Sequence, residues 1–194
     1  TENDKVVILK QPRNIGLAAA FNCGIAWARE RGFSHVLLLD QDSEPAQGMV
    51  DALMQAFTSS SSGRRVAAVG PRFHDAREDR YAPFVRIGFP VSRKIYNTGK
   101  DGLVDCDFLI SSGSLIPLAA LDDIGAMDEG LFIDNVDLEW SFRALAKGYA
   151  LIGVCTTTMH HRLGHSRRQL PFGLGHIVVH DPIRLYYIMR NRLL

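Results

Sequence analysis

Short apolar runs alternate along this chain with segments whose apolar residues recur at helical spacing. The segment 17–28 carries apolar residues every three or four positions, and Gly32 follows it as a stop signal. The runs 36–39 and 66–70 are short and apolar, which is typical of buried strands. Strands that alternate with helices predict an α/β fold, with a mostly parallel sheet and helices on its faces.

The same patterns predict the remaining elements of a single domain. We expect strands at 6–9, 36–39, 66–70, 103–110 and 149–161. We expect helices at 17–31, 45–57, 136–147 and 180–194. The segment 71–102 is rich in arginine, proline and glycine, which indicates an irregular excursion that contains a hairpin.

Composition narrows the classes of protein to which the chain can belong. Its 194 residues, of which 46% are hydrophobic and 22% charged, suffice for one globular core. The formal net charge of +1 gives no electrostatic argument for a nucleic-acid partner. Cys23, Cys106 and Cys155 are odd in number and lie in apolar runs, so we expect buried thiols in a cytoplasmic protein. No apolar run approaches the roughly 18 residues of a membrane span, and no signal-peptide pattern is visible.

Two carboxylates follow the predicted strand 36–39 in the stretch "LLLDQDSEP": Asp40 and Asp42. Ligands of open α/β sheets bind in the crevice beyond the strand ends. Charges of the same sign this close repel each other, so they must reach water or be offset by a cation. Mg²⁺ takes one or two carboxylates and completes its shell with water and phosphate oxygens. The pattern alone leaves two interpretations open, a metal–diphosphate site and a solvated turn.

The helix start "NIGLAAAFNCG" at 14–24 consists almost wholly of glycine, alanine and asparagine. Small residues let a helix N-terminus approach a ligand or pack closely on a sheet. Close packing explains the alanines at 18–20. It does not explain Asn22.

Three acids lie around the start of the predicted helix 136–147, where the helix dipole favours negative charge. Capping explains Asp134. An ionised Asp137 beside a bound substrate can accept a proton from it. Glu139 faces elsewhere on the helix, and we expect it to orient its neighbours or to pair with Arg143.

Taken in order, six segments resemble the inverting family-two glycosyltransferases of the GT-A fold, nearest to their rhamnosyltransferase-like branch. The segments are "NIGLAAAFNCG", "LLLDQDSEP", "SSGSLIP", "IGAMDEGLFIDNVDLEW", "HHRLG" and "DPIRLYYIMRN". The resemblance implies an N-terminally truncated GT-A domain, since family members normally begin with a further strand, helix and strand. It divides residues 1–194 into the rest of a nucleotide-binding half (1–70), the excursion (71–102), an acceptor and catalytic half (103–165) and a C-terminal helical segment (166–194).

The resemblance also implies roles for individual residues. Asp42, with Asp40, would bind Mg²⁺ or Mn²⁺ that bridges the diphosphate of the donor, and His161 would add a metal or diphosphate contact. A histidine at a strand end, in solvent or in the core, explains His161 equally well. Asp137 would be the catalytic base. The substrate-binding residues would be Asn14, Gly16, Asn22, Asp40, Ser112, Gly113, Glu139 and Trp140.

The implied activity is metal-dependent transfer of a sugar, with inversion, from a nucleotide-sugar to a saccharide or lipid-linked acceptor in cell-surface polysaccharide synthesis. The implied donor is dTDP-L-rhamnose. Residues 181–194 mix apolar side chains with arginines, which suits either a core helix or peripheral contact with the inner face of the plasma membrane. An oligomer is compatible with the sequence.

Two alternatives to a glycosyltransferase stay open at this point. A haloacid-dehalogenase phosphatase also ends a buried strand with D-x-D, but its lysine motif is not evident downstream. A non-catalytic module that binds a sugar nucleotide or a glycan would use the same acids without turnover.

Overall fold

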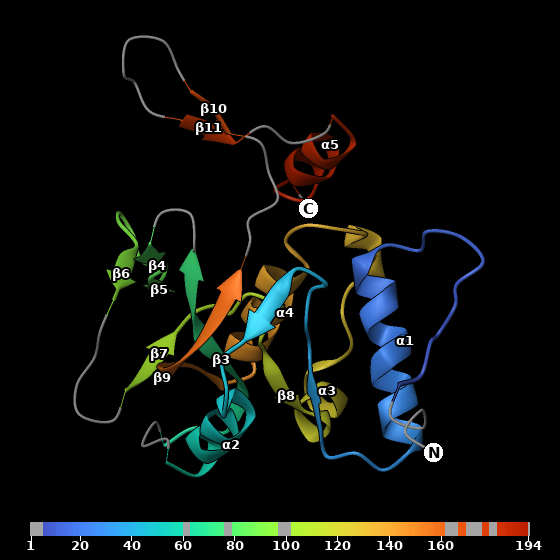
Figure 1. Cartoon of the computed structure of the whole chain (residues 1–194), viewed down its shortest axis with the longest axis horizontal. Helices are drawn as coiled ribbons and strands as arrows, with labels where there is room; N and C mark the ends of the chain where they lie inside the picture. Colours follow the sequence, from blue (N-terminus) through green and yellow to red (C-terminus); the bar gives the residue numbers. More distant parts are fainter. Residues whose placement is uncertain are drawn as a thin grey trace.

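The computed structural model describes residues 6–59, 63–75, 79–96, 102–161, 167–169, 176–178 and 182–193 (Figure 1). Its helices are α1 (Leu17–Glu30), α2 (Met49–Ser59), α3 (Leu118–Ile124), the 3₁₀ helix η2 (Glu129–Leu131), α4 (Val136–Ala146) and α5 (Pro182–Arg190). Its strands are β1 (His35–Leu37), β2 (Ser43–Pro45), β3 (Val66–Asp75), β4 (Arg80–Tyr81), β5 (Phe84–Arg86), β6 (Arg93–Ile95), β7 (Leu103–Cys106), β8 (Leu115–Pro117), β9 (Ala150–His161), β10 (Arg167–Gln169) and β11 (His176–Val178).

Seven of the described strands form one mixed sheet in the order β1-β8-β3-β9-β2, with β4 paired to β3 and β7 paired to β9. The long strands β3 and β9 run parallel, from Val66 opposite Ala150 to Asp75 opposite His161. The other described pairings in this sheet are antiparallel. The predicted mostly parallel sheet is therefore parallel only at its centre. The reason is that β2 and β8 have three residues each, too few to show in a strand–helix alternation.

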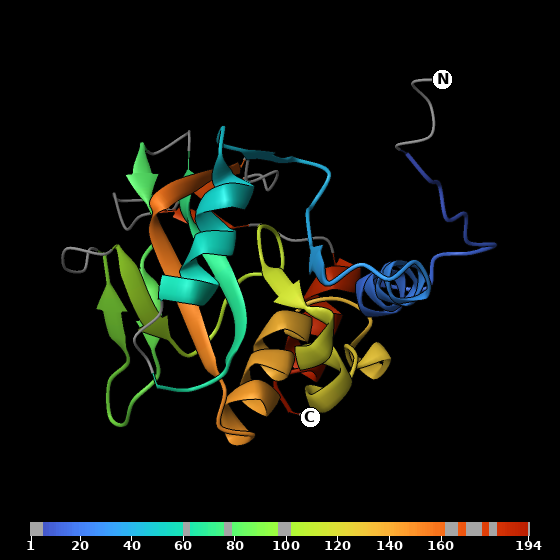
Figure 2. The same ribbon diagram turned by 90° about the horizontal axis from the view of Figure 1, so that it is seen from below.

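Alternate side chains of β3 and β9 fill two cores on opposite faces of the sheet. Ala68 and Leu151 belong to the core shared with α1, α3 and α4. Val69 and Ile152 belong to the core shared with α2. Figures 1 and 2 show α1 at one side of the molecule, beside β1. Burial on both faces explains why these two strands read as continuous apolar runs in the sequence.

Several predicted elements have other bounds in the structure, and the helix predicted at 180–194 is α5, which ends at Arg190. Residues 6–9 form no strand and are exposed, because no described strand pairs with them. The helix predicted at 45–57 begins only at Met49, because Pro45 lies in β2 opposite Met159. The strand predicted at 103–110 ends at Cys106.

The predicted excursion 71–102 is more regular than its composition indicates. β3 continues beyond Pro71 as far as Asp75, with a shift in register between Pro71 and Arg72. A proline inside a strand cannot donate to the ladder, which is why it sits at such an irregularity. The predicted hairpin is confirmed as the antiparallel pair β5–β6.

All three cysteines are thiols, as predicted. Cys106 is buried, and burial raises the pKa of its thiol, whereas Cys23 and Cys155 are only partly buried. Among the described residues, none of the helices combines the length and the apolar character that crossing a membrane requires.

Gly16 joins the start of α1 to the segment that precedes α4. Its φ is +86°, and the backbone N–H of Leu17 donates to the carbonyl of Phe132 at 2.6 Å. A Cβ placed on Gly16 would lie 2.5 Å from the Phe132 ring and 2.7 Å from its carbonyl oxygen. Both the backbone conformation and the close approach therefore require glycine at this position.

We predict that Gly16→Ala lowers the free energy of unfolding by at least about 2 kcal/mol, from the left-handed backbone and the steric overlap. The matched control is Gly24→Ala inside α1, where a Cβ meets nothing within 4 Å. This control should raise stability by about 0.5–1 kcal/mol, because alanine favours a helix. Urea denaturation of both variants measures the two changes in the free energy of unfolding. Equal stability of the two variants would contradict the claim that the close approach to Phe132 requires glycine at position 16.

Candidate functional site

A cleft of about 710 Å³ opens where the chain leaves β1 and β3 and where α4 begins. Five aspartates line this cleft: Asp40, Asp42, Asp75, Asp134 and Asp137. Among the described lining residues, Arg184 is the only lysine or arginine. So strong an excess of carboxylates suits a ligand that carries or recruits a cation.

The D-x-D turn is held in place by Ser112, which is only 1% exposed. The backbone N–H of Asp40 donates to Ser112 Oγ at 3.1 Å, and Ser112 Oγ donates to Ser43 Oγ at 2.7 Å. The backbone N–H of Ser43 donates a hydrogen bond to the Asp40 carbonyl at 3.2 Å. One buried hydroxyl thus ties both ends of the turn, so that Asp40 and Asp42 lie at the cleft.

The carboxylates of Asp40 and Asp42 are oxygen ligands of the kind that Mg²⁺ and Mn²⁺ prefer. No group of three or more histidine, cysteine or acidic side chains gathers as a metal site in the described part of the chain. A metal site that includes nucleotide phosphates needs fewer protein ligands, because Mg²⁺ takes one or two carboxylates and fills its coordination shell with water and phosphate oxygens. His161 pairs through its backbone with Ser43 on β2 and Asp75 on β3, so it lies beside the turn.

Asp137 lies across the cleft, in the first turn of α4. Its carboxylate accepts hydrogen bonds from the backbone N–H groups of Ser111 (3.1 Å) and Leu138 (2.9 Å). Burial raises the pKa of Asp137, and these hydrogen bonds oppose the shift. A fixed carboxylate with a raised pKa is a better proton acceptor near neutral pH than an ordinary surface aspartate.

The segment before α4 is unusually bent. Phe132, Asp134 and Asn135 all have positive φ, near 62–64°, although none is glycine. We expected Asp134 to cap α4, but the N-cap residue of this helix is Asn135. Asp134 instead forms an ion pair with Arg184 of α5, with 3.0 Å between Nη2 and Oδ1. Backbone strain of this kind persists only where surrounding contacts enforce it.

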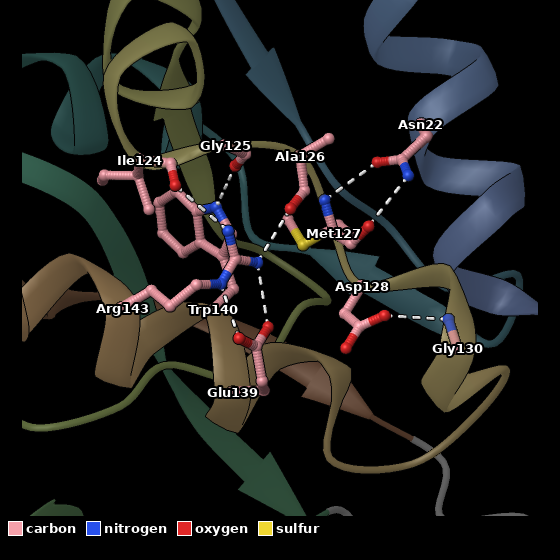
Figure 3. Close-up of polar contacts among 10 residues, drawn as sticks. All are labelled: Asn22, Ile124, Gly125, Ala126, Met127, Asp128, Gly130, Glu139, Trp140 and Arg143. Atoms are coloured by element: carbon pink, nitrogen blue, oxygen red, sulfur yellow. Dashed lines mark hydrogen bonds and ion pairs between the residues drawn. The ribbon is translucent and has the colours of Figure 1, made fainter.

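Three predicted substrate-binding residues lie outside the cleft, in a network that holds residues 124–130 (Figure 3). The Asn22 amide donates to the Met127 carbonyl at 2.9 Å and accepts from the Met127 N–H at 3.0 Å. The indole N–H of Trp140 donates to the Gly125 carbonyl at 2.9 Å, and the side chain is 3% exposed. The prediction that Trp140 binds substrate therefore receives no support from its position in the core.

Glu139 forms an ion pair with Arg143, which confirms the predicted pairing (Figure 3). The guanidinium of Arg143 also donates to the carbonyls of Ile124 (3.1 Å) and Ala126 (2.7 Å). Glu139 thereby fixes the arginine that holds this segment, and it does not line the cleft.

The predicted substrate-binding residues Asn14, Gly16 and Gly113 do not line the cleft. Asn14 accepts a hydrogen bond from the N–H of Gly16 at 3.0 Å, which forms a local turn before α1. Gly113 donates its N–H to the Leu38 carbonyl at 2.7 Å, so that this backbone group is engaged within the fold. Its φ of +86° and the closeness of Pro71 require glycine there. Ser112, by contrast, lines the cleft.

Sequence reasoning missed Asp75, His74 and Arg184. Asp75 and His74 end β3, and their place at the cleft depends on the strand continuing beyond Pro71. His74 Nε2 lies 3.0 Å from Asp79 Oδ1. Arg184 lies inside the stretch "DPIRLYYIMRN", whose arginines we expected on a helix that packs in the core or contacts a membrane, not in the cleft. That stretch was the signal that could have found it.

Open α/β sheets bind their ligands in the crevice beyond the carboxyl ends of their strands, and this acidic cleft lies at such strand ends. Residues 1–123 match the family described as "Glycosyl transferase family 2", and the chain belongs to this family. The family predicted from the resemblance is thereby confirmed, and the phosphatase alternative loses its support.

Two curated relatives are similar over most of the chain. The chain is 31% identical over 98% of its length to a dTDP-rhamnosyl transferase, RfbF, of Shigella flexneri, and spans 63% of that protein. It is 25% identical over 84% of its length to a polyprenol monophosphomannose synthase of Mycolicibacterium smegmatis, and spans 60% of it. The chain thus spans less than two thirds of each relative.

Solved structures confirm the GT-A fold. A crystal structure of GalNAc-T7 with UDP, GalNAc and Mn²⁺ superposes with a TM-score of 0.59 at 16% identity, over 78% of this chain and 31% of that one. The protein A197 from STIV superposes with a TM-score of 0.52 at 12% identity, over 91% of this chain and 81% of that one.

The network around Arg143 yields a test of stability. We predict that Arg143→Ala lowers the free energy of unfolding by about 2–4 kcal/mol, because Glu139 and two carbonyls lose a charged donor. The matched control is Arg29→Ala, which removes an exposed ion pair with Asp122 and should cost less than about 1 kcal/mol. Urea denaturation measures both, and equal losses would show that the network does not stabilise the segment.

Proposed function

We propose that this chain binds a nucleotide-sugar together with Mg²⁺ or Mn²⁺ in the acidic cleft and transfers the sugar to an acceptor hydroxyl with inversion. The observation that carries the proposal is the pairing of two acidic centres across one cleft. One is the turn with Asp40 and Asp42, tied by Ser112. The other is the partly buried Asp137, whose pKa is raised.

Asp42 and Asp40 are the residues that would hold the divalent cation, and His161 is proposed as a further contact beside them. When bound, such a cation neutralises the charge that develops on a departing nucleoside diphosphate. Without a cation, the diphosphate would meet a cleft lined by five aspartates. Electrostatic repulsion therefore makes donor binding depend on the metal.

Asp137 would take the proton of the attacking hydroxyl. Inversion requires a base on the face of the sugar opposite the leaving group. Asp137 lines the cleft from α4, whereas the D-x-D turn lines it from the end of β1, so that donor and base can flank one sugar. The backbone N–H groups of Ser111 and Leu138 fix the orientation of its carboxylate.

The proposed donor is dTDP-L-rhamnose, and the proposed acceptor is a saccharide or a lipid-linked sugar. The donor is supported by similarity to a protein named as a dTDP-rhamnosyl transferase. A lipid-linked acceptor is supported by similarity to a protein named as a polyprenol monophosphomannose synthase. The exposed Ile183, Tyr186 and Met189 of α5 support peripheral contact with a membrane surface, where such an acceptor would lie.

We predict that dTDP raises the melting temperature of the chain only when Mn²⁺ is present, and that Asp42→Ala abolishes this shift. The reason is that the cation must offset the charge of the cleft before a diphosphate enters. The matched control is Asp51→Ala on the exposed face of α2, which should keep the shift. A metal-independent shift, or an unchanged one in Asp42→Ala, would contradict the proposed donor site.

We predict that Asp137→Asn lowers turnover about 10²–10⁴-fold while donor binding is retained, as expected for loss of a general base. Because burial raises the pKa of Asp137, the rate should fall with decreasing pH along a limb whose midpoint lies above the ordinary value of 3.8. Since the folded-state pKa is raised, this group favours folding at low pH and loses that contribution as pH rises through the folded pKa.

Release of dTDP from dTDP-L-rhamnose, followed across pH, measures the limb. Thermal unfolding across pH, compared with Asp137→Asn, measures the linked stability. A chain that binds dTDP with Mn²⁺ but releases none from the sugar nucleotide would be a binding module instead.

A further inference from the structure

Asn191, just beyond the end of α5, is one of few polar side chains buried in the described part of the chain, with 8% exposure. Its amide nitrogen lies 2.9 Å from the Leu131 carbonyl, 2.8 Å from that of Ile133 and 2.9 Å from that of Asp134. Two N–H groups thus serve three carbonyl oxygens, in a shared arrangement. All three oxygens belong to the segment that leads into α4.

This segment is the strained one. Phe132, Asp134 and Asn135 have positive φ angles, a backbone conformation that is costly for residues other than glycine. The carbonyls of Leu131, Ile133 and Asp134 face Asn191, whereas the Phe132 carbonyl accepts from the N–H of Leu17 in α1. An amide donor that collects these carbonyls offsets the cost, because a buried carbonyl without a partner is itself destabilising. Asn191 therefore stabilises the conformation that the local sequence does not favour.

Other residues of α5 contact the same segment through one of its side chains and one of its carbonyls. The ring of Tyr187 stacks on that of Phe132, with 4.8 Å between centroids. Arg190 donates to the Leu131 carbonyl at 3.0 Å and, through Nε, to the Asn191 side-chain oxygen at 2.9 Å. This last bond fixes which end of the Asn191 amide faces the three carbonyls.

We infer that Asn191 is a positioning residue for the reaction, which sets the backbone from which Asp134 and Asp137 project into the cleft. The inference rests on the proposed function, because it assigns Asn191 to the placement of the proposed base. Asn191 does not line the cleft and acts only through the backbone. The link to Asp137 is short, since Asn135 caps α4 and its carbonyl accepts from the Glu139 N–H at 2.9 Å in the first turn.

The test is Asn191→Asp, which keeps the shape of the side chain and replaces its two donors with an acceptor. We expect kcat for dTDP release from dTDP-L-rhamnose to fall about 10- to 100-fold, as for a base displaced by about 1 Å. KM for the donor should change less than about threefold, because the D-x-D turn is not touched. The matched control is Gln55→Glu on the exposed face of α2, the same chemical change away from the cleft.

Hydrogen exchange gives a readout that does not depend on activity. Amides of residues 135–139 should exchange faster in Asn191→Asp, while those of β3 stay protected. Asn191→Ser, which keeps one donor, carries the same comparison if the aspartate variant does not fold. Wild-type kcat together with unchanged exchange at 135–139 would overturn the inference, as would an equal loss of kcat and donor affinity. Equal turnover by wild type and Asp137→Asn would instead show that Asp137 is not the base. That result would overturn the proposed function of Asp137, and the inference about Asn191 that rests on it.

Discussion

The parallel pairing of β3 and β9 is the contact on which the rest of the structure depends. These strands are buried on both faces, so helices must cover both, and each core takes alternate side chains from the same pair. At their far ends the pairing brings Asp75 opposite His161, and His161 in turn lies opposite Ser43. The architecture of the core therefore sets where the D-x-D turn and the acids of the cleft meet.

The segment 124–134, which leads into the cleft-lining residues 133–137, is held by hydrogen bonds to its backbone carbonyls. Asn22 of α1 binds Met127, Arg143 of α4 binds Ile124 and Ala126, and Asn191 after α5 binds three carbonyls between Leu131 and Asp134. A segment of irregular backbone needs such partners, because buried carbonyls cannot be left unpaired. Asn22 and Trp140, which we predicted to bind substrate, instead form hydrogen bonds with the backbone of this segment.

Much of the fold could be predicted from the sequence, and the limits have physical causes. Helices α1 and α4 and strand β9 show clear periodicity or long apolar runs, because they bury one face or both. Residues 6–9 are equally apolar but find no described partner strand, which no local pattern can reveal.

The residues that line the cleft could be predicted to a similar degree. Asp40, Asp42 and Asp137 line the cleft because each follows directly from a strand end or a helix start. Trp140 and Asn22 turn away from it because tertiary packing decides which side of a helix faces the core. Asp75 reaches the cleft through a strand that passes a proline, and Arg184 reaches it through a helix distant in sequence. No local pattern therefore places either side chain in the cleft, although the stretch around Arg184 stands out in the sequence.

The central claim is that a divalent cation with a diphosphate offsets the repulsion among the carboxylates of the cleft. Anomalous diffraction at the manganese edge, from crystals grown with Mn²⁺ and dTDP, tests it most directly. The account predicts an anomalous peak within coordination distance of the Asp42 carboxylate, with diphosphate oxygens completing the shell. A bound dTDP with no manganese at Asp42, or manganese at another place on the chain, would contradict it.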